Sequence, residues 1–265
     1  MPKRDFELRS PWMNATGMLG FAPNPRGPVD LGKLGAFITN PVSLRPRSPA
    51  ESRALLPFPG GFLLHTGWPN PGLRAVLRHW AARWADASLP VVLHLMVSDP
   101  DELAEVAERL EGRLEGLENL AALEISLPPG SSREELARLV EAAAGELPLI
   151  VHLPFENAAE LAQALAGSGA AAVSLAPPRG LLPLKAEPAD AGKPATAPIA
   201  LSSGRLYGPG LLPQALQVVQ AVARAGLPVY GAGGVFSQAD AQAMLAAGAA
   251  AVQLDTVLWG DFSQF

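Results

Sequence analysis

The stretch Ala225-Gly226-Leu227-Pro228-Val229-Tyr230-Gly231-Ala232-Gly233-Gly234 contains, in order, the end of a helix, a short apolar run and a glycine turn. A glycine just after the last helical residue is a common helix C-cap. A short continuous apolar run is typical of a parallel strand that is buried on both faces. A C-cap glycine followed by an apolar run recurs at Ala166–Val173 and at Ala247–Val252. The repeated unit predicts βαβ connections and a parallel sheet.

Runs of this kind alternate with amphipathic stretches along the whole chain of 265 residues. About eight strands in a chain of this length favour a closed barrel over an open sheet, because closure leaves no exposed edge. We therefore predict an α/β protein in which residues 1–265 form a single (β/α)8 TIM barrel. The predicted strands are Ala36–Thr39, Gly61–Leu64 (the weakest), Val91–Leu95, Ala122–Ile125, Leu149–His152, Ala172–Leu175, Val229–Ala232 and Ala251–Leu254. The predicted helices are Pro71–Ala85, Asp99–Leu114, Ser131–Ala144, Asn157–Ala166, Leu212–Ala225 and Ser237–Ala246.

Two segments fall outside the repeat. Residues 1–35 form an N-terminal extension, in which we expect a short hairpin over Phe6–Met13 under the barrel. The Pro-rich segment Pro177–Pro198 predicts a loop insertion after the sixth strand. Such a loop is either a binding lid or an irregular excursion, and the sequence leaves both open. Val257–Phe265 is too short for a full closing helix.

Composition excludes several classes of protein. The formal net charge is −5 and no run of basic residues is present, so we expect no nucleic-acid partner. The chain has no cysteine, which excludes disulfides and a thiolate nucleophile. No apolar run is long enough for a membrane span. A cytoplasmic enzyme or binding protein that acts on a small molecule is the expectation.

The turn after the predicted seventh strand is a candidate phosphate site. Gly233 and Gly234 precede a helix, and Asp255 and Thr256 follow the eighth strand. Backbone N–H groups beside a helix N-terminus bind phosphate in many barrels. A tight turn that needs glycine is the alternative. The carboxylate of Asp255 opposes phosphate binding unless its side chain points into the barrel wall.

Titratable residues gather at the predicted strand ends. His65, His94 and His152 lie there, but their spacing does not support a metal site, and we predict none. His152 or His65 is a candidate general acid or base, since imidazole titrates near neutral pH. Glu124 must be paired if it points inward, and a structural ion pair is as good an interpretation as catalysis.

Taken together, the motifs resemble the dihydroorotate dehydrogenase family over nearly the whole chain. The resemblance implies FMN as the cofactor, a place in pyrimidine biosynthesis, and cofactor contacts from Ala15, Thr16, Gly17, Asn40, His152, Gly204, Gly233, Gly234, Asp255 and Thr256. It implies substrate contacts from Asn70, His94 and Glu124. The stretches that carry it are Trp12–Gly17, Gly35–Arg47, Pro59–Gly72, Ser203–Pro209, Val229–Val235 and Ala247–Thr256.

The chain departs from this family where the chemistry is expected. The family's two lysines are Asn40 and His152 here, and its catalytic cysteine or serine is Leu127, which cannot accept a proton. The family's substrate-binding asparagines are replaced by Leu64, His94, Glu124 and Pro129. Ser126, His152 and His65 are the residues left that could act as a replacement base.

Four functions remain open on these residues. The first is an FMN-dependent oxidoreductase with an altered substrate. The second is a catalytically silent paralogue that binds a ligand or acts as a partner subunit, for example as a homodimer. The third is dihydroorotate dehydrogenase activity itself, and the fourth is a flavin-free lyase or isomerase.

Overall fold

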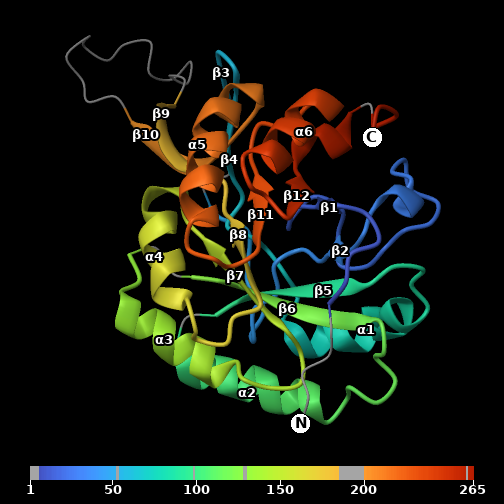
Figure 1. Ribbon diagram of the computed structural model, residues 1–265. Helices are drawn as coiled ribbons and strands as arrows, with labels where there is room; N and C mark the ends of the chain where they lie inside the picture. The colour runs from blue at the N-terminus through green and yellow to red at the C-terminus, as the bar shows by residue number, and fades with distance from the viewer. Residues whose placement is uncertain (1–5, 52–53, 98, 128–129, 185–199, 261) are drawn as a thin grey trace.

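Eight parallel strands form the centre of the molecule in the computed structural model, which describes residues 6–51, 54–97, 99–127, 130–184, 200–260 and 262–265. Their order is β1-β12-β11-β8-β7-β6-β5-β2, and a parallel bridge between Met13 and Ala36 joins the two ends. The protein is therefore the predicted (β/α)8 TIM barrel (Figure 1). The strands are β1 (Trp12–Asn14), β2 (Phe37–Ile38), β5 (Val91–Met96), β6 (Leu120–Ser126), β7 (Leu149–Leu153), β8 (Ala172–Leu175), β11 (Val229–Ala232) and β12 (Ala251–Leu254).

The predicted helices are all present around this barrel, and three of the six begin at a side-chain cap. Asp99 caps α2, Ser237 caps α6, and Ser132 forms the predicted capping box with Glu135 at α3. A single 3-10 turn over Thr256–Trp259 follows β12. No helix in the described ranges is long and apolar enough to cross a membrane. The helices are α1 (Leu73–Ala85), α2 (Pro100–Glu111), α3 (Arg133–Ala142), α4 (Ala158–Leu165), α5 (Leu212–Ala223) and α6 (Gln238–Ala246).

A layer of apolar side chains fills the lower part of the barrel. From β1 through β12, β11, β8, β7 and β6 to β5, large residues alternate with alanines, and β2 contributes Ile38 with Ala36 just before it. Alternation of large and small residues packs a barrel interior without voids. The large residues are Met13, Ile38, Val92, Ile150 and Tyr230, and the alanines are Ala36, Ala122, Ala172 and Ala251.

The N-terminal segment differs from the prediction. Instead of a hairpin over Phe6–Met13, Trp12 and Met13 begin β1, which pairs in parallel with β12. Phe6 and Leu8 pack against the apolar layer of the barrel from outside the strands. The run Trp12–Asn14 has three residues and ends in a polar one, so its role as the first barrel strand could not be seen in the sequence pattern.

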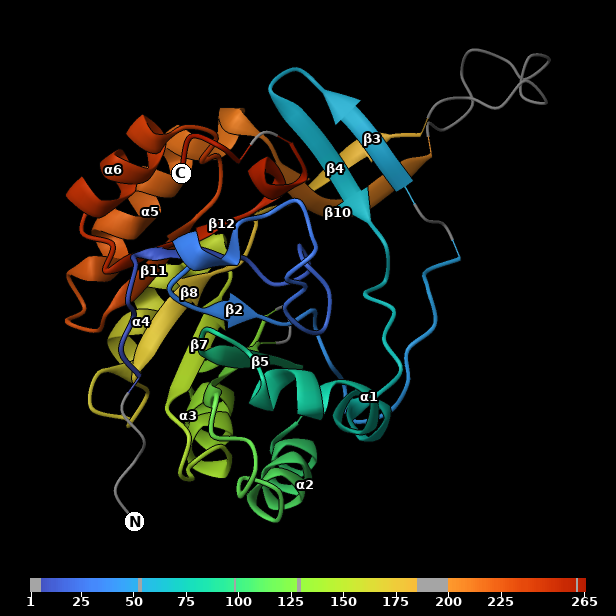
Figure 2. The same cartoon turned by 90° about the vertical axis from the view of Figure 1, so that its right-hand side faces the viewer.

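Gly61–Leu64, the weakest predicted strand, is not a barrel strand. It lies in β4 (Gly61–His65), within an antiparallel sheet of order β3-β4-β10-β9. Figure 2 shows β3, β4 and β10 on the opposite side of the barrel from α2 and α3. β3 (Ala54–Phe58) and β4 leave the barrel after β2, whereas β9 (Arg179–Pro183) and β10 (Leu201–Tyr207) leave it after β8.

The predicted insertion Pro177–Pro198 is partly regular. Its first residues form β9, which pairs with β10 from Arg179↔Arg205 to Pro183↔Leu201. Residues 185–199 lie outside the described ranges. Alternation of side chains in β9 is visible once the pairing is known, but proline at both ends of the strand hid it in the sequence.

The side chain of Asn14 closes the barrel between β1 and β2. Its Oδ1 accepts a hydrogen bond from the Ile38 N–H at 2.9 Å, and its Nδ2 donates to the Ile38 carbonyl at 2.6 Å. Both residues are fully buried. Asn14 therefore pairs two backbone groups of β2 that face β1, where the two strands share a single bridge.

We expect Asn14→Ala to lower the free energy of unfolding by about 2–4 kcal/mol, because it leaves the N–H and C=O of Ile38 buried without partners. Urea unfolding followed by circular dichroism would measure this loss. Asn24→Ala is the matched control, since Asn24 makes an exposed turn contact to Arg26. Equal stability of the two variants would show that closure of the barrel between β1 and β2 does not depend on the Asn14 amide.

Candidate functional site

A buried carboxylate organises the C-terminal half of the barrel interior. Glu124 in β6 has no exposed surface, and its Oε2 lies 2.5 Å from Nδ1 of His94 in β5. Its Oε1 accepts hydrogen bonds from the Ser174 hydroxyl at 2.6 Å and from the Gln253 amide at 2.7 Å. Each of these polar residues lies two positions after a residue of the apolar layer on the same strand. Because side chains two apart in a strand share a face, the polar groups also point into the barrel.

Two further contacts extend this network toward the strand ends. Nε2 of His94 lies 2.7 Å from Oγ of Ser126, the last residue of β6. Nδ1 of His152 lies 2.9 Å from Oγ of Ser174. The two imidazole rings meet edge to face, with centroids 5.1 Å apart. Sequence-predicted His94, Glu124, Ser126 and His152 are thus brought together in one network.

Hydrogen-bond acceptors fix the tautomers of both histidines. The carboxylate accepts from Nδ1–H of His94, which leaves the His94 Nε2 lone pair for the Ser126 hydroxyl. Ser174 donates its hydroxyl proton to Glu124, so it accepts from Nδ1–H of His152. Nε2 of His152 is then a buried acceptor, and no protein partner for it exists among the described residues.

Charges in the network follow from burial and these contacts. Burial alone would raise the pKa of Glu124, but the neighbouring His152 and the hydrogen bonds from His94 and Ser174 lower it to about 2. Burial lowers the pKa of His152 to about 3, against the attraction of Glu124. At neutral pH Glu124 is therefore ionised and His152 is neutral. His152 does not replace the positive charge of the family's lysine.

The glycine turn after β11 is tight for structural reasons. Gly234 has φ of +77°, and a Cβ there would lie 2.3 Å from the backbone nitrogen of Leu212 at the start of α5. A Cβ on Gly233 would approach the ring of Phe155. Both glycines are thus explained by packing, and their presence alone does not indicate a phosphate.

Asp255 points into this turn rather than into the barrel wall. Its Oδ1 accepts from the Thr256 N–H at 2.5 Å, and the Gly234 N–H also bonds to the carboxyl group. Burial raises the pKa of Asp255 to about 6, against the lowering effect of those two N–H groups. The side chain is 2% exposed and Oδ2 has no partner among the described residues. The carboxyl group therefore takes N–H groups that a phosphate would use.

The segment after β1 lies under an aromatic residue. Gly17 has φ of +86°, and a Cβ there would lie 2.5 Å from the Trp68 ring. The guanidinium of Arg205 lies over the Trp68 ring, 5.2 Å from the ring centroid. Nε of Arg205 is buried and has no partner among the described residues. Ala15 and Thr16 are buried and bond to the backbone of β12 and of Thr39. Trp68 and Arg205 were not predicted as site residues.

Four further predicted site residues lie outside the Glu124 network, as do those of the two segments just described. Oδ1 of Asn40 accepts from Gly20 N–H. The Asn70 side chain bonds to Ser43, Gly72 and Trp68 and so fixes its own loop. Gly204 lies in β10, where a Cβ would collide with Leu63. His65 ends β4 in the antiparallel sheet and not a barrel strand.

Ser174 and Gln253 are network members that the sequence analysis missed. Each lies two residues after an interior alanine, Ala172 in β8 and Ala251 in β12. The alternation of a strand places both in the barrel, and that signal was present in the sequence. Among the described residues, no group of His, Asp and Glu side chains has the arrangement of a metal site.

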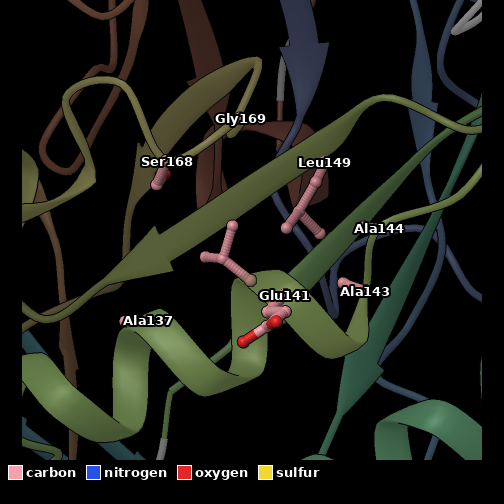
Figure 3. Close-up of a pocket in the computed structure, with 8 residues that line it drawn as sticks. Ala137, Glu141, Ala143, Ala144, Leu149, Ser168 and Gly169 are labelled. Carbon is pink, nitrogen blue, oxygen red and sulfur yellow. The ribbon is translucent and has the colours of Figure 1, made fainter.

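A cavity of about 380 Å³ lies away from this network. Figure 3 shows it between α3 and the start of β7, with Glu141, Leu149 and Ser168 around it. Leu149 is the first residue of β7, so the cavity is at the opposite end of the strands from Ser126 and His152. Its lining is mostly apolar, and it lacks the convergent polar groups of a ligand site.

We expect Glu124→Gln to destabilise the fold by about 3–5 kcal/mol at pH 7, because it breaks a fully buried charge network. Native pKa values below the ordinary 4.5 for Glu124 and 6.5 for His152 mean that the unfolded chain binds more protons in acid. Wild-type stability should fall as the pH drops from about 6.5 toward 2. Glu124→Gln should lose the contribution of Glu124, which lies between about 4.5 and 2, and keep the contribution of His152 between about 6.5 and 3. Urea unfolding across this range is the measurement. Glu160→Gln, at an exposed pair with Arg133, is the control and should leave stability unchanged; similar losses in both variants would contradict the network's role.

Comparison with known proteins gives the network a context. The sequence model of the family described as dihydroorotate dehydrogenase matches residues 4–149 and 188–264. The catalytic subunit of dihydroorotate dehydrogenase B (NAD(+)) from Pelobacter propionicus is 35% identical, over 94% of this chain and 84% of its own length. The proteins of that name from Trichlorobacter lovleyi and Geotalea uraniireducens are 33% and 32% identical over the same shares.

The matched ranges contain His94, Glu124, Ser126 and Gln253 of the network, whereas His152 and Ser174 lie between the two ranges. These relatives support an oxidoreductase of the dihydroorotate dehydrogenase type. The chain belongs to the dihydroorotate dehydrogenase family.

Proposed function

We propose that this chain is an FMN-dependent oxidoreductase whose substrate differs from dihydroorotate. The observation that carries the proposal is the Glu124 network, which presents a hydroxyl and an unpartnered imidazole nitrogen at the C-terminal ends of the strands. This is the face on which TIM barrels place their active sites. The relatives' names supply the reaction class, and the changed side chains supply the altered substrate.

Two features of the barrel fit FMN. The unpartnered, buried Nε2 of His152 has the position and the lone pair to meet a polar ligand above β7. Gly233 and Gly234 precede α6, where a phosphate is stabilised by the helix dipole, and a bound phosphate would compete with the Asp255 carboxyl group for the N–H groups of Gly234 and Thr256. We propose that these residues, with Ala15, Thr16, Gly17 and Asn40 along the rim, hold the cofactor. When bound, FMN supplies a hydride acceptor.

Polar groups of the network define what the substrate must offer. His152 is neutral and its free nitrogen is an acceptor, so it selects a ligand with an N–H or O–H group. The ionised Glu124 is fully enclosed and acts by holding His94 and Ser174 in place. A site built from imidazole acceptors differs from one built from amides, which both donate and accept. We therefore propose that His94 and Glu124 alter substrate choice.

Asp255 favours a second candidate function, that of a catalytically inactive paralogue that binds a partner chain. Its carboxyl group occupies N–H groups of the proposed phosphate cradle. Leu55, Leu181 and Leu201 are 64%, 63% and 57% exposed on the antiparallel sheet. The pairing register puts all three on one face of that sheet. Exposed apolar side chains gathered on one face are suited to another chain.

FMN binding tests the two candidates against each other. We expect the purified protein to retain flavin absorbance after FMN is added and the sample is desalted. We expect Asp255→Asn to bind FMN about tenfold more tightly at pH 8, since it removes a negative charge beside the phosphate. Equilibrium titration by flavin fluorescence measures both affinities.

Protonation gives a second prediction for this site. Because the pKa of Asp255 is raised to about 6, its repulsion of phosphate is lost as the pH falls through 6. Wild-type protein should therefore bind FMN more tightly at pH 5.5 than at pH 8, and Asp255→Asn should lose most of that difference. Riboflavin, which has no phosphate, is the control ligand. Absence of retained flavin in both proteins would overturn the proposed function.

A further inference from the structure

Glu124, His94 and Ser126 form a linear chain of hydrogen bonds that runs from the barrel interior to a strand end. The distances are 2.5 Å from Glu124 Oε2 to His94 Nδ1 and 2.7 Å from His94 Nε2 to Ser126 Oγ. Glu124 and His94 are 0% and 1% exposed, and Ser126 is half-buried. Only the hydroxyl end of the chain is open to a ligand.

The order of groups gives Ser126 an unusual environment. Glu124 holds the proton of His94 on Nδ1, so the Nε2 lone pair faces the serine hydroxyl. An imidazole in this position can take the hydroxyl proton, and the adjacent carboxylate stabilises the imidazolium that results. The second carboxylate oxygen is held by Ser174 and Gln253, which prevents the carboxylate from turning away.

Neighbouring residues show why Ser126, and not the next position, faces the site. Leu127 packs against the outer hydrophobic cluster beneath the helices. Ser126 follows Glu124 by two residues and therefore points into the barrel.

His152 is the other candidate base in this network. Burial lowers the pKa of His152 to about 3, which makes it a weak base.

We propose that Ser126 accepts the substrate proton during oxidation, and that His94 and Glu124 activate it. This inference rests on the proposed oxidoreductase function. The substrate C–H bond breaks with its proton going to Ser126 Oγ, while the serine's own proton moves to Nε2 of His94. FMN, held by the residues proposed above, would supply the two-electron acceptor for the hydride from the neighbouring carbon. Ser126 is the catalytic residue, and His94 and Glu124 are positioning residues.

A single cysteine tests the relay directly, because the chain has none of its own. In Ser126→Cys the new thiol replaces the hydroxyl against Nε2 of His94. An imidazole held by a carboxylate stabilises a thiolate, so the thiol pKa should lie about one unit or more below the ordinary value of about 8.5. The rate of iodoacetamide alkylation as a function of pH measures that pKa. Ser88→Cys, at an exposed serine, is the matched control.

Removal of either positioning residue should abolish the effect. In the double variants Ser126→Cys/His94→Asn and Ser126→Cys/Glu124→Gln, the thiol pKa should return to the control value. Circular dichroism checks that each variant is folded, and either folded double variant is sufficient for the comparison. The relay would be falsified by either of two results. The thiol in Ser126→Cys could have the same pKa as the thiol in the Ser88→Cys control, or it could keep a lowered pKa in a folded double variant that lacks His94 or Glu124.

Turnover of the flavin-loaded protein tests the role of the hydroxyl in the reaction. With a donor that reduces the wild-type flavin, Ser126→Ala should slow flavin reduction by about 100-fold or more, and Ser126→Cys should retain most of the rate. Unchanged reduction in Ser126→Ala would overturn the catalytic role. The thiol titration needs neither flavin nor substrate, so its result is independent of the FMN-binding test.

Discussion

The ionised carboxylate of Glu124 lies inside a barrel core, where an unpaired charge would cost several kcal/mol. The structure meets this constraint with hydrogen bonds from His94, Ser174 and Gln253, which come from three other strands. Because these partners are needed to hold the charge, their orientations are fixed. The fixed orientations in turn set which nitrogen of His94 and of His152 faces the ligand side. The chemistry available at the strand ends is therefore a consequence of how one buried charge is stabilised.

The rim above this network differs from a simple flavin cradle at two places. Trp68 lies against Gly17 and carries Arg205 on its ring, and both come from the connections that form the antiparallel sheet. Asp255 bonds to the N–H groups of Thr256 and Gly234. These features add a carboxyl group at the proposed phosphate site and, nearby, a guanidinium whose Nε has no partner among the described residues. Asn40 and His152 stand at the positions of the family's two lysines, so the positive charge at this rim comes from Arg205 in β10.

The barrel was predictable because its strands are short apolar runs at a regular spacing, with helices whose caps are visible in the sequence. β1 was missed because three residues give no periodicity, and β4 was misassigned because an apolar run carries no information about its partner. The gathering of His94, Glu124, Ser126 and His152 followed from their strand-end positions. Ser174 and Gln253 were missed because a serine and a glutamine in a strand carry no chemical signal alone. The tautomers and the direction of Asp255 depend on pairings between distant segments, which no local pattern encodes.

The central claim is that Glu124 holds the ring proton of both His94 and His152 on Nδ1. Nitrogen-15 NMR of the imidazole side chains measures this directly, and the chain has 4 histidines, so assignment by substitution is practical. At pH 8 we predict that His94 and His152 both carry the ring proton on Nδ1 and show an unprotonated Nε2. In Glu124→Gln this preference should be lost for His94. A proton on Nε2 of His94 or His152 in the wild-type protein would contradict the account.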